Sequence, residues 1–79
     1  MLGCRLNDVS TAEHLVSICR QFEEEIDVIH GRYIIDGKST LGVVSLIGNI
    51  VSLEINTSNE KNKEKFEKEI MKLNESVGD

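Results

Sequence analysis

Ser39 is the residue whose type and position could most readily do chemistry. It follows a turn-like Asp36-Gly37-Lys38 and precedes a short apolar stretch from Leu41 to Leu46, so it stands at the N-cap position of a predicted helix. An N-cap serine accepts a hydrogen bond from the free backbone N–H groups of the first turn. A phosphate there would meet the same groups and the positive end of the helix dipole. Ser39 is therefore predicted to cap a helix, at a position where a phosphate would be stabilised.

The residues around Ser39 resemble a segment of a known family. Lys38-Ser39, followed by Gly42-Val43 and Ser45-Leu46, is similar to the regulatory-serine helix of the HPr family, the small phosphocarriers of bacterial sugar phosphotransferase systems. The resemblance runs without a gap over residues 15 to 33, and the chain length fits. It implies that Ser39 is phosphorylated by a dedicated kinase and that the product is a co-regulator of carbon catabolite control. Thr40 departs from the family, which usually has an apolar residue here.

The resemblance breaks at the family's phosphorylated histidine. In HPr this histidine lies in a Gly-x-His-Ala-Arg-Pro-Ala signature, 31 residues before the regulatory serine, and the residue 31 positions before Ser39 is Asp8. Ser10 replaces the arginine of the signature, Thr11 replaces its proline, and only Ala12 matches. The chain thus resembles HPr without the catalytic histidine, a feature that it shares with catabolite-repression HPr.

Asp8 has three interpretations that the residues leave open. It is a loop or helix-start carboxylate favoured by the helix dipole, a mimic of the charge of phosphohistidine that holds a partner-binding state, or an acceptor that forms an acyl phosphate. Acyl-phosphate sites hold Mg²⁺ with additional carboxylates, and no such acidic cluster accompanies Asp8 in the sequence. The missing arginine also disfavours a phosphocarrier, because arginine is the natural ligand of an incoming phosphate.

The two histidines and two cysteines offer no competing site. His14 lies 25 residues before Ser39, inside the predicted helix and not at its start, and His30 lies at the end of a predicted hairpin. Two isolated histidines do not make a zinc site, and Cys4 and Cys19 lack metal-ligand spacing. We expect two buried, reduced thiols, no metal, no cofactor and no catalytic residue.

Length and charge restrict the classes of function. The 79 residues are enough for one domain, residues 1–79, with one small core. A net charge of −5 disfavours a nucleic-acid surface. No apolar run approaches the roughly 20 residues of a membrane span, and the first residues lack the pattern of a secretory signal. The sequence therefore favours a cytoplasmic protein that binds neither nucleic acid nor membrane.

Hydrophobic periodicity predicts the first half of the fold. Residues 1–6 alternate as a strand. A capping box of Ser10 and Glu13 predicts the start of an amphipathic helix that ends near Glu24. The apolar residues of this helix recur at helical spacing: Ala12, Leu15, Val16, Cys19 and Phe22. Residues 26–30 and 33–35 then form a hairpin around the two-residue turn Gly31-Arg32.

The second half adds a short helix, a strand and a long helix. The short helix covers residues 40 to 46 or 47, Gly48-Asn49 forms a turn, and residues 51–55 alternate as a strand. Thr57 and Glu60 supply another capping box, and a charged helix follows to about Glu75, with Phe66, Ile70 and Leu73 as its buried stripe. The order βαββαβα predicts an α+β, HPr-like open-faced two-layer sandwich, in which two longer helices and one short helix cover one face of a four-stranded antiparallel sheet.

The sequence-based hypothesis is a non-enzymatic HPr-like regulatory or adaptor protein of the phosphotransferase system or of carbon catabolite control. Its partners would be phosphotransferase-system enzymes, HPr kinase or a transcription regulator. The residues expected to contact the partner come from the two segments that align with the family's phosphorylated histidine and regulatory serine: Asp8, Ser10, Lys38, Ser39, Leu41 and Val44. Two alternatives stay open, a phosphocarrier with an altered acceptor and a diverged HPr-like binding domain unrelated to sugar uptake.

Overall fold

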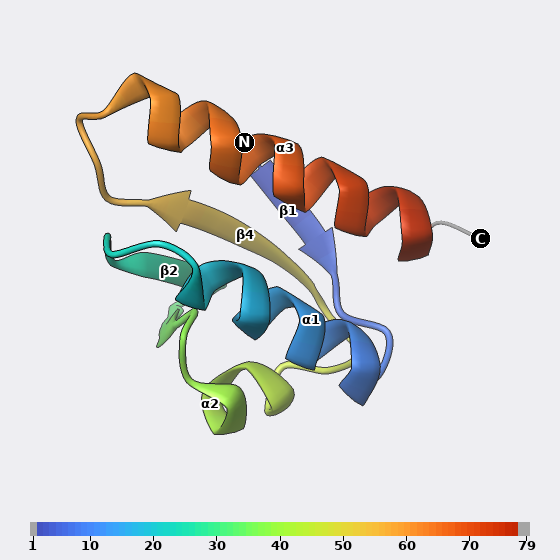
Figure 1. The fold of residues 1–79 in the computed structure, drawn as a ribbon. Coiled ribbons are helices and arrows are strands. Elements are labelled where there is room, and N and C mark those ends of the chain that lie inside the picture. The colour runs from blue at the N-terminus through green and yellow to red at the C-terminus, as the bar shows by residue number, and fades with distance from the viewer. Residues whose placement is uncertain (1, 78–79) are drawn as a thin grey trace.

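Four strands and three helices make up the computed structural model, which describes residues 2–77, except for the side chain of residue 77. Met1, in the predicted first strand, lies outside the described residues. The elements follow the predicted order: β1 (Leu2–Arg5), α1 (Val9–Arg20), β2 (Ile26–His30), β3 (Tyr33–Asp36), α2 (Thr40–Val44), β4 (Ile50–Ile55) and α3 (Glu60–Val77). The strands form one antiparallel sheet in the order β1-β4-β2-β3, and the helices lie on one of its faces (Figure 1). The predicted α+β sandwich is confirmed.

Alternating side chains separate the covered face of the sheet from the open one. Val28 of β2 pairs with Leu53 of β4, and both are buried under the helices. Their neighbours along the strands point to the open face, since successive side chains of a strand alternate. The two-residue turn between β2 and β3 begins at Gly31, whose φ of 60° is the left-handed conformation that glycine adopts without strain. The predicted hairpin is therefore confirmed with its turn.

The core lies between the sheet and the helical layer. Leu15 of α1 and Phe66 and Ile70 of α3 have no exposed surface. The rings of Phe22 and Phe66 meet edge to face at 87°, with centroids 5.5 Å apart, a geometry that aromatic pairs prefer. None of the helices within residues 2–77 combines the length and apolar character that a membrane crossing requires.

Several helix boundaries differ from the predictions. Helix α2 ends at Val44, not at residue 46 or 47, because the N–H groups of Leu46 and Ile47 bond to carbonyls three residues back and continue the chain as turns. Helix α1 ends at Arg20, not near Glu24. The Glu24 carboxylate lies outside it and accepts hydrogen bonds from Asn62 Nδ2 at 2.7 Å and Thr57 Oγ1 at 3.1 Å, which lower its pKa. These bonds connect the segment between α1 and β2 to the start of α3.

The predicted cap of α3 is also wrong. Asn59 caps this helix, because its side chain accepts from the N–H groups of Lys61 at 3.0 Å and Asn62 at 3.2 Å. Thr57 accepts from the N–H of Asn59 at 3.0 Å and so supports the turn that precedes the helix.

Candidate functional site

Ser39 caps α2 as the sequence predicted. Its backbone is extended, with φ −94° and ψ 108°, and its Oγ accepts a hydrogen bond from the N–H of Gly42 at 3.1 Å. The preceding turn is fixed by Asp36, whose carboxylate accepts from the N–H of Lys38 at 2.9 Å and whose carbonyl accepts from the N–H of Ser39 at 3.0 Å. The Ser39 hydroxyl is therefore held at the first turn of α2 and is partly exposed.

Arg20 is the residue beside Ser39 that sequence reasoning missed. Its Nε donates to the carbonyl of Lys38 at 3.1 Å, and a terminal guanidinium nitrogen donates to Thr40 Oγ1 at 3.4 Å. The guanidinium thus contacts the residues on both sides of Ser39. The one signal in the sequence is a cation in the last turn of a helix, which the dipole explains equally well. Only the packing of α1 beside α2 assigns Arg20 to this site.

Gly42 lets α2 lie close to the sheet. A Cβ at this position would stand 2.6 Å from Cγ2 of Ile35 in β3 and 3.2 Å from Ser39 Oγ. Both distances are shorter than a van der Waals contact, so a larger residue requires α2 to move. The absence of a side chain at Gly42 therefore positions the helix that Ser39 caps.

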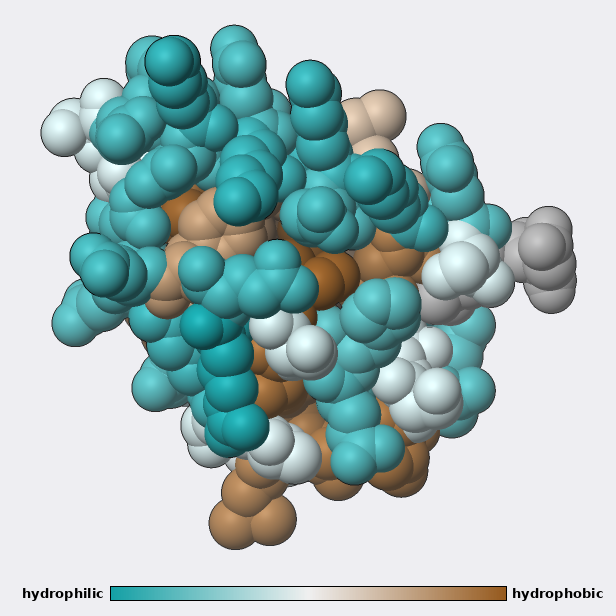
Figure 2. Space-filling view, viewed as in Figure 1, coloured by the Kyte–Doolittle hydropathy of each residue, from teal (hydrophilic) through white to brown (hydrophobic). Residues whose placement is uncertain are grey.

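The apolar residues of α2 divide between core and surface. Val43 is fully buried, Val44 is half-buried against the core, and the Leu41 side chain is 84% exposed. Figure 2 shows hydrophilic side chains over α3 and hydrophobic ones reaching the surface at the lower edge, over α2. Leu41 and Val44 thus present apolar surface on the helix that begins at Ser39.

Asp8 caps α1. Its carboxylate accepts from the N–H and from the hydroxyl of Thr11, both at 2.8 Å, and the two hydrogen bonds, the backbone one foremost, lower its pKa. The predicted Ser10–Glu13 capping box is wrong, because Ser10 lies within the first turn, exposed. The interpretation of Asp8 as a helix-start carboxylate fits this geometry. His14 is an exposed residue of the same helix.

The structure does not bring Asp8 and Ser39 together. Arg20 at the end of α1 contacts the start of α2, whereas Leu6, just before α1, exchanges backbone hydrogen bonds with Gly48 and Asn49, which follow α2. The two helices therefore run in opposite directions (Figure 1). Asp8 and Ser39 stand at opposite ends of α1, whose 12 residues span about 18 Å. Of the six predicted contact residues, Lys38, Ser39, Leu41 and Val44 form one group and Asp8 and Ser10 another.

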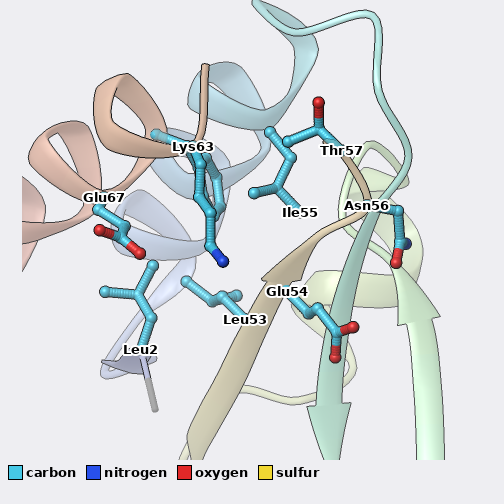
Figure 3. A pocket seen from close by; sticks show the side chains of 9 residues that line it. Leu2, Leu53, Glu54, Ile55, Asn56, Thr57, Lys63 and Glu67 are labelled. Atoms are coloured by element: carbon cyan, nitrogen blue, oxygen red, sulfur yellow. The ribbon is translucent and has the colours of Figure 1, made fainter. Parts of the chain in front are cut away.

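A pocket of about 460 Å³ lies apart from both helix ends, between α3 and the strands β1 and β4. In Figure 3, Leu53 and Ile55 point toward α3, whereas Glu54 and Asn56 point away from it. The described residues leave no buried polar side-chain atom without a hydrogen bond. The pocket thus has an apolar floor, the exposed side chains of Lys63 and Glu67 on its α3 side, and no buried polar side-chain atom left without a partner.

The described residues contain no group of three or more His, Cys, Asp or Glu side chains placed to hold a metal ion. Cys4 and Cys19 are free and buried, and burial raises their pKa values to about 11 and about 12. Of the two helix starts that the sequence singled out, that of α1 is closed by the Asp8 carboxylate and that of α2 by the Ser39 hydroxyl. Only the hydroxyl can accept a phosphoryl group as a stable ester.

Two solved structures are similar to this chain. HPr-C-His from Thermoanaerobacter tengcongensis matches with a TM-score of 0.73 and 23% identity, over 94% of this chain and 89% of that one. Crh, the catabolite repression containing protein of Bacillus subtilis, was solved as an intertwined dimer with a swapped domain, and matches with a TM-score of 0.63 and 19% identity, over 89% and 86% of the two chains. No family model and no curated protein matches the sequence. The chain therefore has the HPr-like fold that the resemblance implied.

Proposed function

We propose that the chain is a cytoplasmic, single-domain, HPr-like regulatory or adaptor protein of the phosphotransferase system or of carbon catabolite control. In this proposal Ser39 is its phosphorylation site, and the protein carries no phosphoryl group on histidine and catalyses no reaction. Its partner binds the exposed surface of α2 and of the turn before it, to which Lys38, Ser39, Leu41 and Val44 contribute. The protein is recognised by HPr kinase and by a regulator or phosphotransferase-system enzyme.

The observation that carries this proposal is the Asp8 carboxylate on the first turn of α1. A phosphocarrier needs a neutral nucleophile there and free donors for the incoming phosphate. Asp8 is anionic at neutral pH, since its pKa is lowered, and it already occupies the Thr11 N–H and hydroxyl. Like charge repels a phosphoryl donor. The capped end of α1 therefore favours a protein that does not relay phosphate through this position.

The start of α2, which lies beside the end of α1, is suited to a phosphoserine. Transfer of the γ-phosphoryl group of ATP forms a bond from Ser39 Oγ to phosphorus, releases ADP and removes the hydroxyl proton. The new phosphate oxygens would lie beside the N–H that Ser39 Oγ now engages and beside the Arg20 guanidinium. A phosphate placed on helix N–H groups and next to arginine gains charge-assisted hydrogen bonds. Phosphorylation would thus add charge next to the exposed side chain of Leu41, where it can change partner binding.

The experiment compares two phosphoryl donors. The purified protein is incubated with ATP and HPr kinase, and separately with phosphoenolpyruvate and enzyme I, and intact mass and peptide mapping locate any phosphate. An authentic HPr in parallel reactions shows that both donors are active. Ser39→Ala removes the proposed acceptor. Ser45→Ala is the matched control, because Ser45 is an exposed serine at the other end of α2.

We expect one phosphate from ATP, on Ser39, in the wild type and in Ser45→Ala, and none in Ser39→Ala. Phosphoenolpyruvate should give no phosphate on any variant. Phosphate on Asp8 or His14 from phosphoenolpyruvate would replace this proposal by an altered phosphocarrier. No phosphate from either donor would refute the phosphorylation of Ser39 and leave a diverged binding domain.

A further inference from the structure

The two edge strands of the sheet, β1 and β3, differ in how far other elements cover them. At the β1 edge, Asn74 of α3 donates from its side chain to the outward carbonyl of Gly3 at 2.8 Å. At the β3 edge, Tyr33 and Ile34 have side chains that are 66% and 65% exposed. An uncovered apolar edge strand is a template for pairing with another strand. Strand β3 is therefore the edge of this sheet at which a further strand can add.

The register shows which backbone groups of β3 face outward. The partners His30↔Tyr33 and Val28↔Ile35 alternate with Ile29↔Ile34, and the two-residue turn makes His30 and Tyr33 a hydrogen-bonded pair. The hydrogen bond from Gly37 N–H to the Ile26 carbonyl at 2.8 Å continues the same alternation. The N–H and C=O of Ile34 consequently point away from β2. They are placed to exchange two hydrogen bonds with a neighbouring antiparallel strand.

The charges that flank β3, Arg32 in the turn before it and Asp36 at its last position, are complementary to those of a second copy. Asp36 lies opposite Asp27, which lies opposite Glu54, so three carboxylates form one row across three strands. Like charges in directly opposite positions destabilise a sheet. The salt bridge found among residues 2–77 joins Lys72 and Glu69, far from this row in the chain. Lys38 lines the same hollow as Asp27 and Asp36, and within residues 2–77 it forms no salt bridge with either carboxylate. A cation of a second copy beside Asp36 would therefore add an attraction that one chain alone does not make.

We propose that two copies of the chain pair through β3, antiparallel about a two-fold axis at Ile34, to form one continuous eight-stranded sheet. In this register the two-fold axis passes beside Ile34, so Ile34 faces Ile34 of the second copy. Arg32 of each copy faces Asp36 of the other, which gives two such pairs in the dimer. Arg32 belongs to the turn just before β3 and is exposed, so its long side chain is free to reach the Asp36 carboxylate of the second copy. On the helical face, Tyr33 covers Ile35 of the second copy, which is only half-buried in one chain. The proposal is independent of the phosphorylation of Ser39.

The pairing buries one short strand, less than a standard protein interface. We therefore expect a reversible dimer whose fraction rises between about 10 μM and 1 mM protein. Its population should fall as salt is added, because the Arg32–Asp36 pairs are exposed and screened.

Sedimentation equilibrium tests the edge with a pair of matched variants. Ile34→Lys places a charge on the β3 edge and should weaken dimerisation by at least about tenfold. Ile50→Lys is the control, because Ile50 is also 65% exposed on the open face but lies in β4, paired with Arg5. It should leave the dimer unchanged. Equal effects of the two variants, or a wild type that stays monomeric up to about 1 mM, would overturn the proposal.

A charge exchange tests the register. Arg32→Asp alone opposes two aspartates in the dimer, and Asp36→Arg alone opposes two arginines, so each variant should be monomeric. Mixed in equal amounts, they place an aspartate opposite an arginine at both positions and should recover the dimer. Recovery also shows that both variants are folded. A dimer that persists in each single variant, as an exchange of another element would give, refutes pairing through β3. So does a mixture of the two variants that remains monomeric while both give native circular dichroism spectra.

Discussion

The substitution Gly42→Ala tests why α2 lies where it presents Ser39. In an ordinary helix interior this change stabilises the protein. Here the new Cβ would stand 2.6 Å from Ile35 Cγ2 and 3.2 Å from Ser39 Oγ. Either α2 moves away from β3, or Ile35 changes its rotamer. Both adjustments disturb the first turn of α2, whose Gly42 N–H donates to Ser39.

Two opposing contributions set the size of the effect. Alanine in place of glycine gains about 0.8–1 kcal/mol of helix propensity, and overpacking a tight site costs about 1–3 kcal/mol. Because Ile35 is β-branched, its Cγ2 moves only with a change of χ1, which is stiff in such residues. Overpacking therefore prevails, and we expect a net loss of about 1 kcal/mol in the free energy of unfolding, which lowers Tm by about 4–8 °C.

Urea unfolding, followed by circular dichroism, measures this loss in two backgrounds. Ile35→Ala removes Cγ2, so in that background Gly42→Ala should lose most of its cost and approach the gain of about 1 kcal/mol that propensity alone gives. The reasoning is refuted if Gly42→Ala stabilises the wild type. An equal cost in both backgrounds would also show that contact with Ile35 does not explain the glycine.

Three further predictions concern the cap of α1, the thiols and the core. The hydrogen bonds from Thr11 lower the pKa of Asp8 from 3.8, so the ionised carboxylate stabilises the folded state above that pH, and this stabilisation is lost as the pH falls through the folded-state value. Asp8→Asn should therefore flatten the acid limb of a plot of unfolding free energy against pH, and an unchanged limb would contradict the cap. Burial raises the pKa values of Cys4 and Cys19 to about 11 and about 12, so iodoacetamide at about pH 8 should label both in urea and neither in the native protein; rapid native labelling counts against two buried thiols. Phe66→Ala should lose about 3–5 kcal/mol in urea titrations, and a loss under about 1 kcal/mol is incompatible with a fully buried ring in the core.

The sequence predicts the parts of this fold that depend on neighbours in the chain. The N-cap role of Ser39 follows from the turn before it and the apolar run after it. The hairpin follows from two apolar strands around Gly31, whose positive φ matches the turn. The order of elements then limits the arrangement to a two-layer sandwich. The solved structures with the same fold agree with this prediction.

Features that depend on contacts between distant segments could not be predicted in this way. Two side chains near the start of α1, Asp8 and Ser10, are possible caps with a partner three residues later. The choice is decided by Thr11, which is buried and gives Asp8 two donors. Arg20 is assigned to the site of Ser39 only by the packing of α1 beside α2. Periodicity predicts which face of a helix is buried, but not which end of it meets which neighbour.

The most direct test of the central claim is phosphoryl transfer from phosphoenolpyruvate through enzyme I. The intact mass of this chain is measured beside that of an authentic HPr in the same reaction. The claim is that a carboxylate cap has replaced phosphocarrier chemistry at Asp8. The account predicts that HPr gains a phosphate and that this chain does not. A gain of mass on this chain that hydroxylamine removes would reveal an acyl phosphate on Asp8 and contradict the account. An acid-labile gain on His14 would contradict it equally.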